Sequence, residues 1–270
     1  MESVFRRVKS GYEASASGCA GWYPDVLHGG AVAGFISHFC TSYPTSKPMR
    51  LARVTVDLFK PVIRNHLEVS VEVLRNSKNL QVLEAKLLRK GSLVAKASVL
   101  KIRENASIGL ACHDSSDKLD FPDPVNVFKL TNPSMNEIRN FAKDAVEINR
   151  VEGMPFDEDG PGSLWIRPKL NLIEGESMHP GISAIVAADF GNAISSVFPL
   201  DSHIYINADL GVEFYRMPRG EWIGVESITH NTQDGVGLVQ TKLYDREGLI
   251  GGAHQCLVMD TREHFFKGVN

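Results

Sequence analysis

The sequence is poor in the features that define several protein classes. Its four cysteines form no Cys-x-x-Cys pair, which argues against a zinc site and against a dense disulfide framework. Its apolar segments are too short to span a bilayer, and the first residues, MESVFRR, lack the apolar stretch of a signal peptide. Lysine and arginine (29) do not outnumber aspartate and glutamate (32), so no basic surface for nucleic acid is expected. These absences favour a cytoplasmic globular protein with no membrane span, no nucleic-acid partner and no metal.

Signature motifs of several enzyme classes are missing as well. The sequence has no G-x-S-x-G motif of serine hydrolases, no Walker loop, no H-E-x-x-H and no G-x-G-x-x-G after a predicted strand. The glycines at 234–237 (DGVG) and 248–252 (GLIGG) fit turns and close packing better than a phosphate site. Any chemistry must therefore be sought at single positions.

The most informative feature that is present is an internal duplication. Residues 56–61 (VDLFKP) match 212–218 (VEFYRMP), and residues 86–91 (KLLRKG) match 242–248 (KLYDREG), both at a distance of 156 positions. Such a repeat indicates two similar units in one chain. A similar step places the apolar run AVAGF on AADF, with Gly34 opposite Asp189. We therefore expect one structural unit and one chemical unit.

Each unit is predicted to contain one apolar helix and an antiparallel sheet, because Val- and Leu-rich segments are joined by short turns. The expected helices are 31–39 and 181–197. The expected strands are 53–59, 67–74, 82–88 and 93–102 in the first unit, and 165–172, 204–215, 222–229, 237–244 and 250–259 in the second. This pattern predicts an α+β fold, divided into an N-terminal unit with a linker (1–130) and a C-terminal unit (131–270).

Asp189 is the sharpest candidate for chemistry. On a helix it follows Ile185 by four positions and Val186 by three, which places it on the apolar stripe. Burying an unpaired carboxylate costs several kcal/mol or more, so such a group is hydrogen-bonded, protonated or faces a wet cavity. The structural alternatives are a helix shifted by one position, which would expose Asp189, or a carboxylate satisfied by nearby backbone.

Three further positions are weaker candidates. Gln255 shares strand parity with Ala253 and Leu257, so its amide points to a core face, where it could hold a water or merely tie down backbone groups. Asn207 has the parity of a solvated strand residue. His28 precedes two glycines before the first helix, a place for a helix cap or for exposed amides that bind an anion or a carbonyl oxygen.

Together these positions resemble one family. His28-Gly29-Gly30, residues 187–190 (AADF), residues 207–210 (NADL) and His254-Gln255 are similar in order and spacing to the acyl-CoA thioesterase II-like proteins. The resemblance covers about residues 21–102 and 165–260, and it implies a double hotdog fold, in which each of two tandem units has a long helix wrapped by an antiparallel sheet. Hotdog relatives often assemble further, so the resemblance leaves open whether this protein forms a homo-oligomer.

The resemblance also implies a catalytic set and a reaction. The set is an aspartate on the second hotdog helix, a threonine or similar residue on the next strand and a glutamine on the last strand, which fall on Asp189, Asn207 and Gln255. Asn207 stands where the best-known members carry threonine. The implied reaction is hydrolysis of an acyl-CoA or a carrier-bound acyl thioester by an activated water. Coenzyme A would be part of the substrate and no other cofactor is implied, while His28, Gly29 and Gly30 are candidates for binding the substrate.

Two rival interpretations stay open. The first is a non-hydrolytic enzyme on the same scaffold, such as a dehydratase, an isomerase or a cyclising catalyst in a biosynthetic pathway. Hydratase-type hotdog enzymes usually pair an Asp with a His, and the sequence suggests no such pair, since His179 lies ten residues before Asp189. The second is a non-catalytic acyl-binding protein, for which Asp189 would be a remnant.

Overall fold

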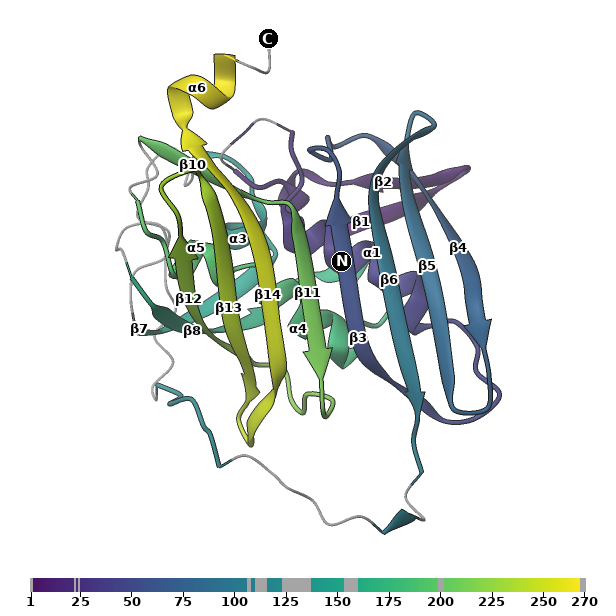
Figure 1. Cartoon of the computed structure of the whole chain (residues 1–270). Helices are drawn as coiled ribbons and strands as arrows, with labels where there is room; N and C mark the ends of the chain where they lie inside the picture. Colours follow the sequence, from purple (N-terminus) through teal and green to yellow (C-terminus); the bar gives the residue numbers. More distant parts are fainter. Residues whose placement is uncertain are drawn as a thin grey trace.

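The computed structural model describes residues 2–21, 23, 25–105, 108–109, 116–122, 137–152, 160–198 and 202–267 (Figure 1). Within these residues one sheet of fourteen strands runs in the order β7-β8-β12-β13-β14-β11-β3-β6-β5-β4-β2-β1-β9, and β10 also pairs with β14. The strands are β1 Ser3–Val8, β2 Gly11–Ala14, β3 Met49–Leu58, β4 His66–Asn76, β5 Leu80–Arg89, β6 Ser92–Arg103, β7 Val146–Glu152, β8 Gly162–Pro168, β9 Asn171–Ile173, β10 His203–Asn207, β11 Asp209–Phe214, β12 Ile223–Asn231, β13 Val236–Asp245 and β14 Gly248–Thr261.

The two central helices, α1 Gly29–Thr41 and α4 Pro180–Ala188, lie behind this sheet in Figure 1 and are buried on nearly all sides. The helices are α1 Gly29–Thr41, α3 Phe141–Asp144, α4 Pro180–Ala188, α5 Gly191–Ile194 and α6 Arg262–Lys267, with a short 3-10 turn at Ala16–Gly18. A helix that is apolar all round is stable only inside a protein, and the sheet provides that cover. The predicted α+β class with two wrapped helices is therefore confirmed. The predicted second helix is wrong in its length, because the helix breaks at Asp189 and Phe190.

The duplication is present in the structure with the expected step of 156. The amides of Phe59 and Lys60 donate to Val94 O, and the amides of Tyr215 and Arg216 donate to Ile250 O in the same way. The two units join where β3 pairs with β11, Val54 facing Val212 and Val56 facing Leu210. This pairing maps onto itself when the units are exchanged, so the sheet is continuous across an approximate twofold axis.

The helices α1 and α4 correspond at a different spacing from the strands, and this corrects the expected match of Gly34 with Asp189. His28 accepts a hydrogen bond from the Gly30 amide at the start of α1, and His179 accepts one from the Gly181 amide at the start of α4, both at 3.1 Å. These equivalent caps lie 151 positions apart. The residue of α1 that corresponds to Asp189 is therefore His38, and the expected match with Gly34 is wrong.

Glycines let the two helices approach each other closely. A Cβ added to Gly30 would lie 2.7 Å from Val186 O, and one added to Gly34 would lie 2.7 Å from Val186 Cγ2. Gly30 also faces Asp189, whereas Gly34 also faces Ile182. The helices are thus antiparallel, and the N-terminus of α1 meets the C-terminal end of α4.

The predicted strand 204–215 is wrong as one element, since it consists of β10 and β11, separated at the exposed residue Ala208. The predicted unit boundary at 130/131 lies outside the described residues, so the division into 1–130 and 131–270 stays a prediction. The N-terminal strand β1 pairs in parallel with β9 of the second half, so the units exchange contacts at this edge as well.

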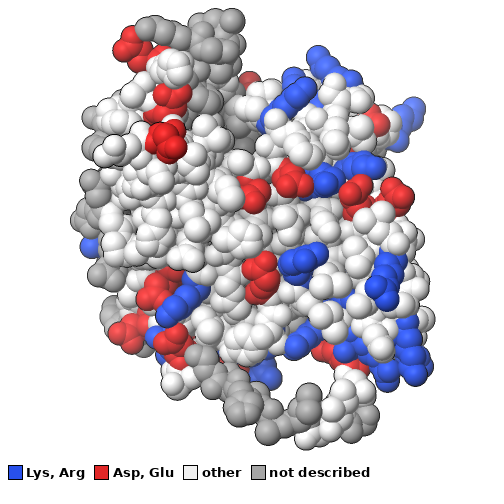
Figure 2. All heavy atoms as spheres, in the orientation of Figure 1, with Lys and Arg blue, Asp and Glu red and all other residues white. Residues whose placement is uncertain are grey.

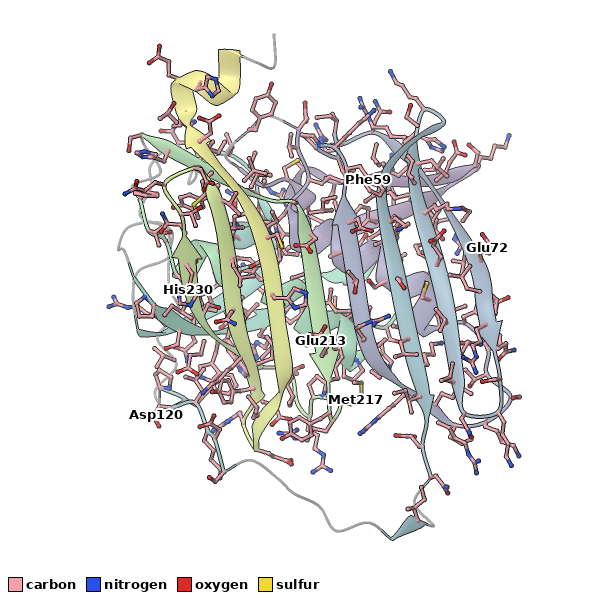
Figure 3. All side chains as sticks on the ribbon, viewed as in Figure 1. Phe59, Glu72, Asp120, Glu213, Met217 and His230 are labelled. Atoms are coloured by element: carbon pink, nitrogen blue, oxygen red, sulfur yellow. The ribbon has the colours of Figure 1, made fainter. Side chains whose placement is uncertain are left out.

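The outward face of β12 and β13 carries exposed apolar side chains. Ile228, Val236 and Leu238 are each more than a third exposed, and His230, labelled in Figure 3, pairs with Leu238 across the two strands. Figure 2 shows few charged side chains over the middle of this face. Self-association of the chain stays a prediction. None of the helices in the described ranges is long and apolar enough to cross a membrane.

Candidate active site

Asp189 ends α4 and is almost completely buried, with 4% of its surface exposed. Both carboxylate oxygens accept hydrogen bonds: Oδ2 from the Gly30 amide at 2.5 Å and Oδ1 from Asn207 Nδ2 at 2.6 Å. The apolar-stripe prediction for Asp189 is therefore confirmed in its burial, and the exposed alternative is wrong. The positive end of the α1 dipole adds favourable electrostatics for a negative charge at this point.

Gly29 and Gly30 bring the start of α1 against this carboxylate. A Cβ on Gly29 would lie 2.7 Å from Asp189 Oδ1 and 2.8 Å from Oδ2, and a Cβ on Gly30 would lie 3.1 Å from Asp189 Cβ. Any side chain at Gly29 would displace the carboxylate. The close backbone approach expected of these glycines is thus directed at Asp189, a residue of the other unit.

His28 comes next to Asp189 from the first unit. Its Nδ1 lies 3.0 Å from Asp189 Oδ2, and its ring is held between Phe141 and Phe190, with centroids 4.9 and 4.8 Å away. The Gly30 N–H is shared between His28 Nδ1 and Asp189 Oδ2. The expectation that no His accompanies the Asp is therefore wrong: the partner is His28 and not His179, which caps the other helix. Sequence distance concealed this pair because its members belong to different units.

Asn207 is half-buried and faces the site, in contrast to the solvated strand residue that its parity suggested. Tyr205, which has the same parity on β10, is also buried, with its hydroxyl donating to Ser196 Oγ at 2.9 Å. The Asn207 Oδ1 atom accepts a hydrogen bond from Asn192 Nδ2 at 2.6 Å. The sequence interpretation missed Asn192, although it follows Asp189 by three positions, a spacing that places helical residues on one face.

Gln255 is fully buried on β14, as its parity predicted. Its Nε2 lies 3.4 Å from the Asp189 carbonyl oxygen and 3.5 Å from Asp189 Oδ1, both long contacts. Its Oε1 has no hydrogen-bond partner in the described part of the chain. Gln255 therefore supports Asp189 from behind.

A cavity of about 360 Å³ opens in front of Asp189, Asn192, Asn207, His28 and Gly29. Its volume is within the usual range for small-molecule sites, about 300–1,000 Å³. The remaining walls are mostly apolar and come from both units, among them Val26, Val32, Val62, Ala193, Ile204 and Tyr205. Gln255 is not among the described residues that line it.

Two cationic side chains line the cavity, and the exposed Lys60 marks its mouth. Lys60 and Arg262 line the cavity, and Phe59, labelled at the end of β3 in Figure 3, is 49% exposed beside them. Lys60 makes no ion pair within the residues the structure describes. Its counterpart Arg216 instead binds Asp245 of the same unit through two hydrogen bonds, one of them at 2.7 Å.

The equivalent place in the first unit lacks the polar set. His38 stands in place of Asp189 and binds Glu176 through its Nε2 at 2.7 Å. Leu51 and Val99 correspond to Asn207 and Gln255 by the step of 156, and both are buried. At these positions the second unit carries polar side chains where the first unit is apolar or binds Glu176, and His28, Gly29 and Gly30 of the first unit lie against Asp189 of the second. The division into a structural and a chemical unit stays a prediction.

Solved structures share this architecture. A conserved hot dog protein of unknown function from Alicyclobacillus acidocaldarius matches with a TM-score of 0.72 at 14% identity, over 95% of both chains. A proposed thioesterase II from Thermobifida fusca YX gives 0.70 at 11% identity, also over 95% of both. An acyl-CoA thioesterase II from Mycobacterium marinum gives 0.63 at 14% identity, over 93% of this chain and 91% of that one. The fold is thus a double hotdog, as predicted.

The family is shown by the sequence models. Residues 19–102 match the acyl-CoA thioesterase N-terminal domain, and residues 115–259 match the acyl-CoA thioesterase C-terminal domain. The chain belongs to this acyl-CoA thioesterase family. No curated protein sequence matches it.

Proposed function

We propose that the protein hydrolyses an acyl-CoA, or a related carrier-bound acyl thioester, to the free acid and the thiol. The observation that carries this proposal is the position of Asp189, a buried carboxylate at the wall of an apolar cavity with cations at its mouth. An apolar cavity suits an acyl chain, and a carboxylate within it suits general-base catalysis. A role in lipid metabolism and a cytoplasmic location belong to the same proposal.

The proposed reaction begins with a water molecule in the cavity beside Asp189. The carboxylate takes a proton from this water while the water oxygen attacks the thioester carbonyl carbon. When the tetrahedral intermediate collapses, the C–S bond breaks and the proton held by Asp189 passes to the leaving thiolate. Asn207 lines the cavity and orients the carboxylate and the water. Gln255 contacts Asp189 but does not line the cavity, so we assign it a supporting role behind Asp189.

The oxyanion that forms on the carbonyl oxygen needs a hydrogen-bond donor. The Gly30 amide is already engaged by Asp189 Oδ2. Gly29 lines the cavity, and as the first residue of α1 its amide has no acceptor within the helix. As the first amide of α1, it also carries part of the positive end of the helix dipole. We therefore propose that the Gly29 amide donates the hydrogen bond that stabilises the oxyanion.

Lys60 is proposed to bind a phosphate of coenzyme A at the mouth. Replacing it by alanine is expected to raise KM for acyl-CoA about two- to fivefold with kcat unchanged, since an exposed charge pair contributes up to about 1 kcal/mol. Hydrolysis of an acyl-N-acetylcysteamine thioester, which has no phosphate, should be unaffected. Lys78→Ala, at an exposed turn far along the first unit, is the matched control. Equal losses on both substrates would show that Lys60 does not recognise phosphate.

The function is tested by following thiol release from short, medium, long and aromatic acyl-CoAs. We expect at least one of these substrates to be turned over. The contact between His28 and Asp189 keeps proton-transfer chemistry of the hydratase type as a second candidate, so an enoyl-CoA is included and its hydration followed separately. Hydration without thiol release would favour that candidate. Tight binding without any turnover would favour an acyl-binding protein.

A further inference from the structure

We infer that Asn192 is a positioning residue, which fixes the amide of Asn207 so that its NH₂ group faces Asp189. Three side chains form a directed chain of hydrogen bonds: Asn192 Nδ2 donates to Asn207 Oδ1, and Asn207 Nδ2 donates to Asp189 Oδ1, both at 2.6 Å. The kinetic part of the inference rests on the proposed hydrolysis, whereas the orientation of the amide does not.

The direction of these two hydrogen bonds follows from the carboxylate of Asp189. A carboxylate only accepts hydrogen bonds, so the atom of Asn207 that lies 2.6 Å from Asp189 must be its nitrogen. The oxygen of Asn207 then points to Asn192, and the atom of Asn192 at 2.6 Å must be a donor as well. The two ends of a carboxamide have nearly the same size and shape, so packing alone selects between them weakly. The reversed amide would place its oxygen against the carboxylate, and the donor at Asn192 adds a second penalty, because it would then face the NH₂ group of Asn207.

Asn192 is suited to this task by its backbone. It lies on α5, directly after Gly191, where an added Cβ would be 2.7 Å from Thr241 Oγ1 and 2.9 Å from Gln255 Oε1. This segment therefore rests tightly on the sheet. Asp189 and Asn192 are separated by one turn of the same segment, so the carboxylate and the donor that orients its partner move together.

The hydrogen bonds of Asn192 and Asn207 also explain how an asparagine at position 207 can serve where relatives carry a threonine. A threonine hydroxyl rotates to donate or accept as its neighbours require, so it needs no second residue to set its direction. A carboxamide reaches further and has two different ends, and only one end can face a carboxylate. We therefore expect Asn192 to matter because residue 207 is an asparagine.

The test compares four proteins: the wild type, Asn192→Ala, Asn207→Thr and the double variant. In the wild-type background Asn192→Ala is expected to lower kcat for thiol release on the order of tenfold with KM changed less than about twofold, because misplaced catalytic groups slow the chemical step. In the Asn207→Thr background the same substitution should change kcat less than about twofold. An equal loss in both backgrounds, or a loss confined to KM, would assign Asn192 to the cavity wall and overturn the inference.

A second variant of Asn192 tests the inference even if the Asn207→Thr protein is inactive. Asn192→Leu keeps the branched shape of the side chain, at a larger volume, but cannot donate a hydrogen bond. The inference predicts a loss as large as that of Asn192→Ala, whereas a wall residue predicts activity close to that of the wild type.

The orientation can be measured without activity. In ¹⁵N-labelled protein the side-chain NH₂ signal of Asn207 is assigned by its disappearance in Asn207→Thr. We expect it to be displaced from the signals of exposed amides in the wild type and to move toward them in Asn192→Ala. An unchanged signal overturns the inference. A wild type that shows the displaced signal but releases no thiol would contradict the proposed function and leave the orientation intact.

Discussion

Replacing Asp189 by asparagine is expected to lower kcat for thiol release by about a hundredfold or more, the scale for loss of a general base. The side chain keeps its shape but can no longer take a proton. It also offers one oxygen where two donors, the Gly30 amide and Asn207 Nδ2, now find two. A hundredfold loss corresponds to about 2.7 kcal/mol of transition-state stabilisation. The measurement is steady-state thiol release from the best acyl-CoA substrate.

The control for this substitution is Asp57→Asn. Asp57 is a partly exposed carboxylate on β3 whose Oδ2 lies 3.4 Å from Lys96 Nζ, and it does not line the cavity. Its neutralisation is expected to leave kcat within about twofold of the wild type. If Asp189→Asn retains a third or more of the wild-type kcat while it is folded, Asp189 is not the general base and the proposed mechanism is wrong.

Most of the sheet, although not β1, β2 or β7, could be predicted because its signals are local and repeated. Alternating apolar residues and short turns specify each hairpin, and the step of 156 recurs in the hydrogen bonds that Val94 and Ile250 accept. The helices carry no such signal. Both are apolar on every side, so their sequences can be aligned at several registers, and only the caps at His28 and His179 set the step of 151.

The site could be predicted in part, for a related reason. A buried carboxylate or amide stands out from an apolar pattern, as at Asp189 and Gln255. His28 and Asp189 meet only because α1 and α4 are antiparallel, and no pattern along the chain encodes that contact. The parity of Asn207 misleads because β10 ends at Asn207 itself, so the alternation with Asp209 beyond the break indicates nothing about which face Asn207 occupies.

The two units also differ at a second pair of equivalent positions. By the step of 156, Lys60 and Arg89 of the first unit correspond to Arg216 and Asp245 of the second. Two cations cannot form the ion pair that Arg216 forms with Asp245. The difference leaves Lys60 available at the cavity mouth, and it makes the second unit depend on a buried charge.

Replacing that buried charge is expected to produce the largest loss of stability. Asp245 has a fully buried side chain and accepts hydrogen bonds from the Arg216 guanidinium and from the amides of Arg219 and Glu247. Breaking a buried ion pair on one side costs about 3–5 kcal/mol. Because Arg216 is about one fifth exposed, we expect Asp245→Asn to lie near the lower end, about 3 kcal/mol. For a chain of this size that is roughly 6–12 °C in the unfolding temperature, measured by circular dichroism.

The effect should depend on pH in a defined direction. Burial alone would raise the pKa of Asp245, but the hydrogen bonds from Arg216 and from the two amides outweigh it and hold the pKa below its ordinary value. A carboxyl whose pKa is lowered by folding stabilises the protein above its unfolded pKa, about 4, and loses that contribution as the pH falls through the folded pKa. The stability difference between wild type and Asp245→Asn should therefore be full at neutral pH and shrink below about pH 4.

Glu247→Gln supplies the matched control from the same hairpin. Glu247 binds Arg219 at 2.6 Å, a contact similar in length to the one between Arg216 Nη2 and Asp245 Oδ1 at 2.7 Å, but more than half of each side chain is exposed. Water and salt screen such a pair, so its loss is expected to cost less than about 1 kcal/mol. Burial and not contact distance then accounts for the difference between the two variants. Equal losses at neutral pH, or a difference that persists unchanged in acid, would contradict this assignment of the stability to the Asp245 charge.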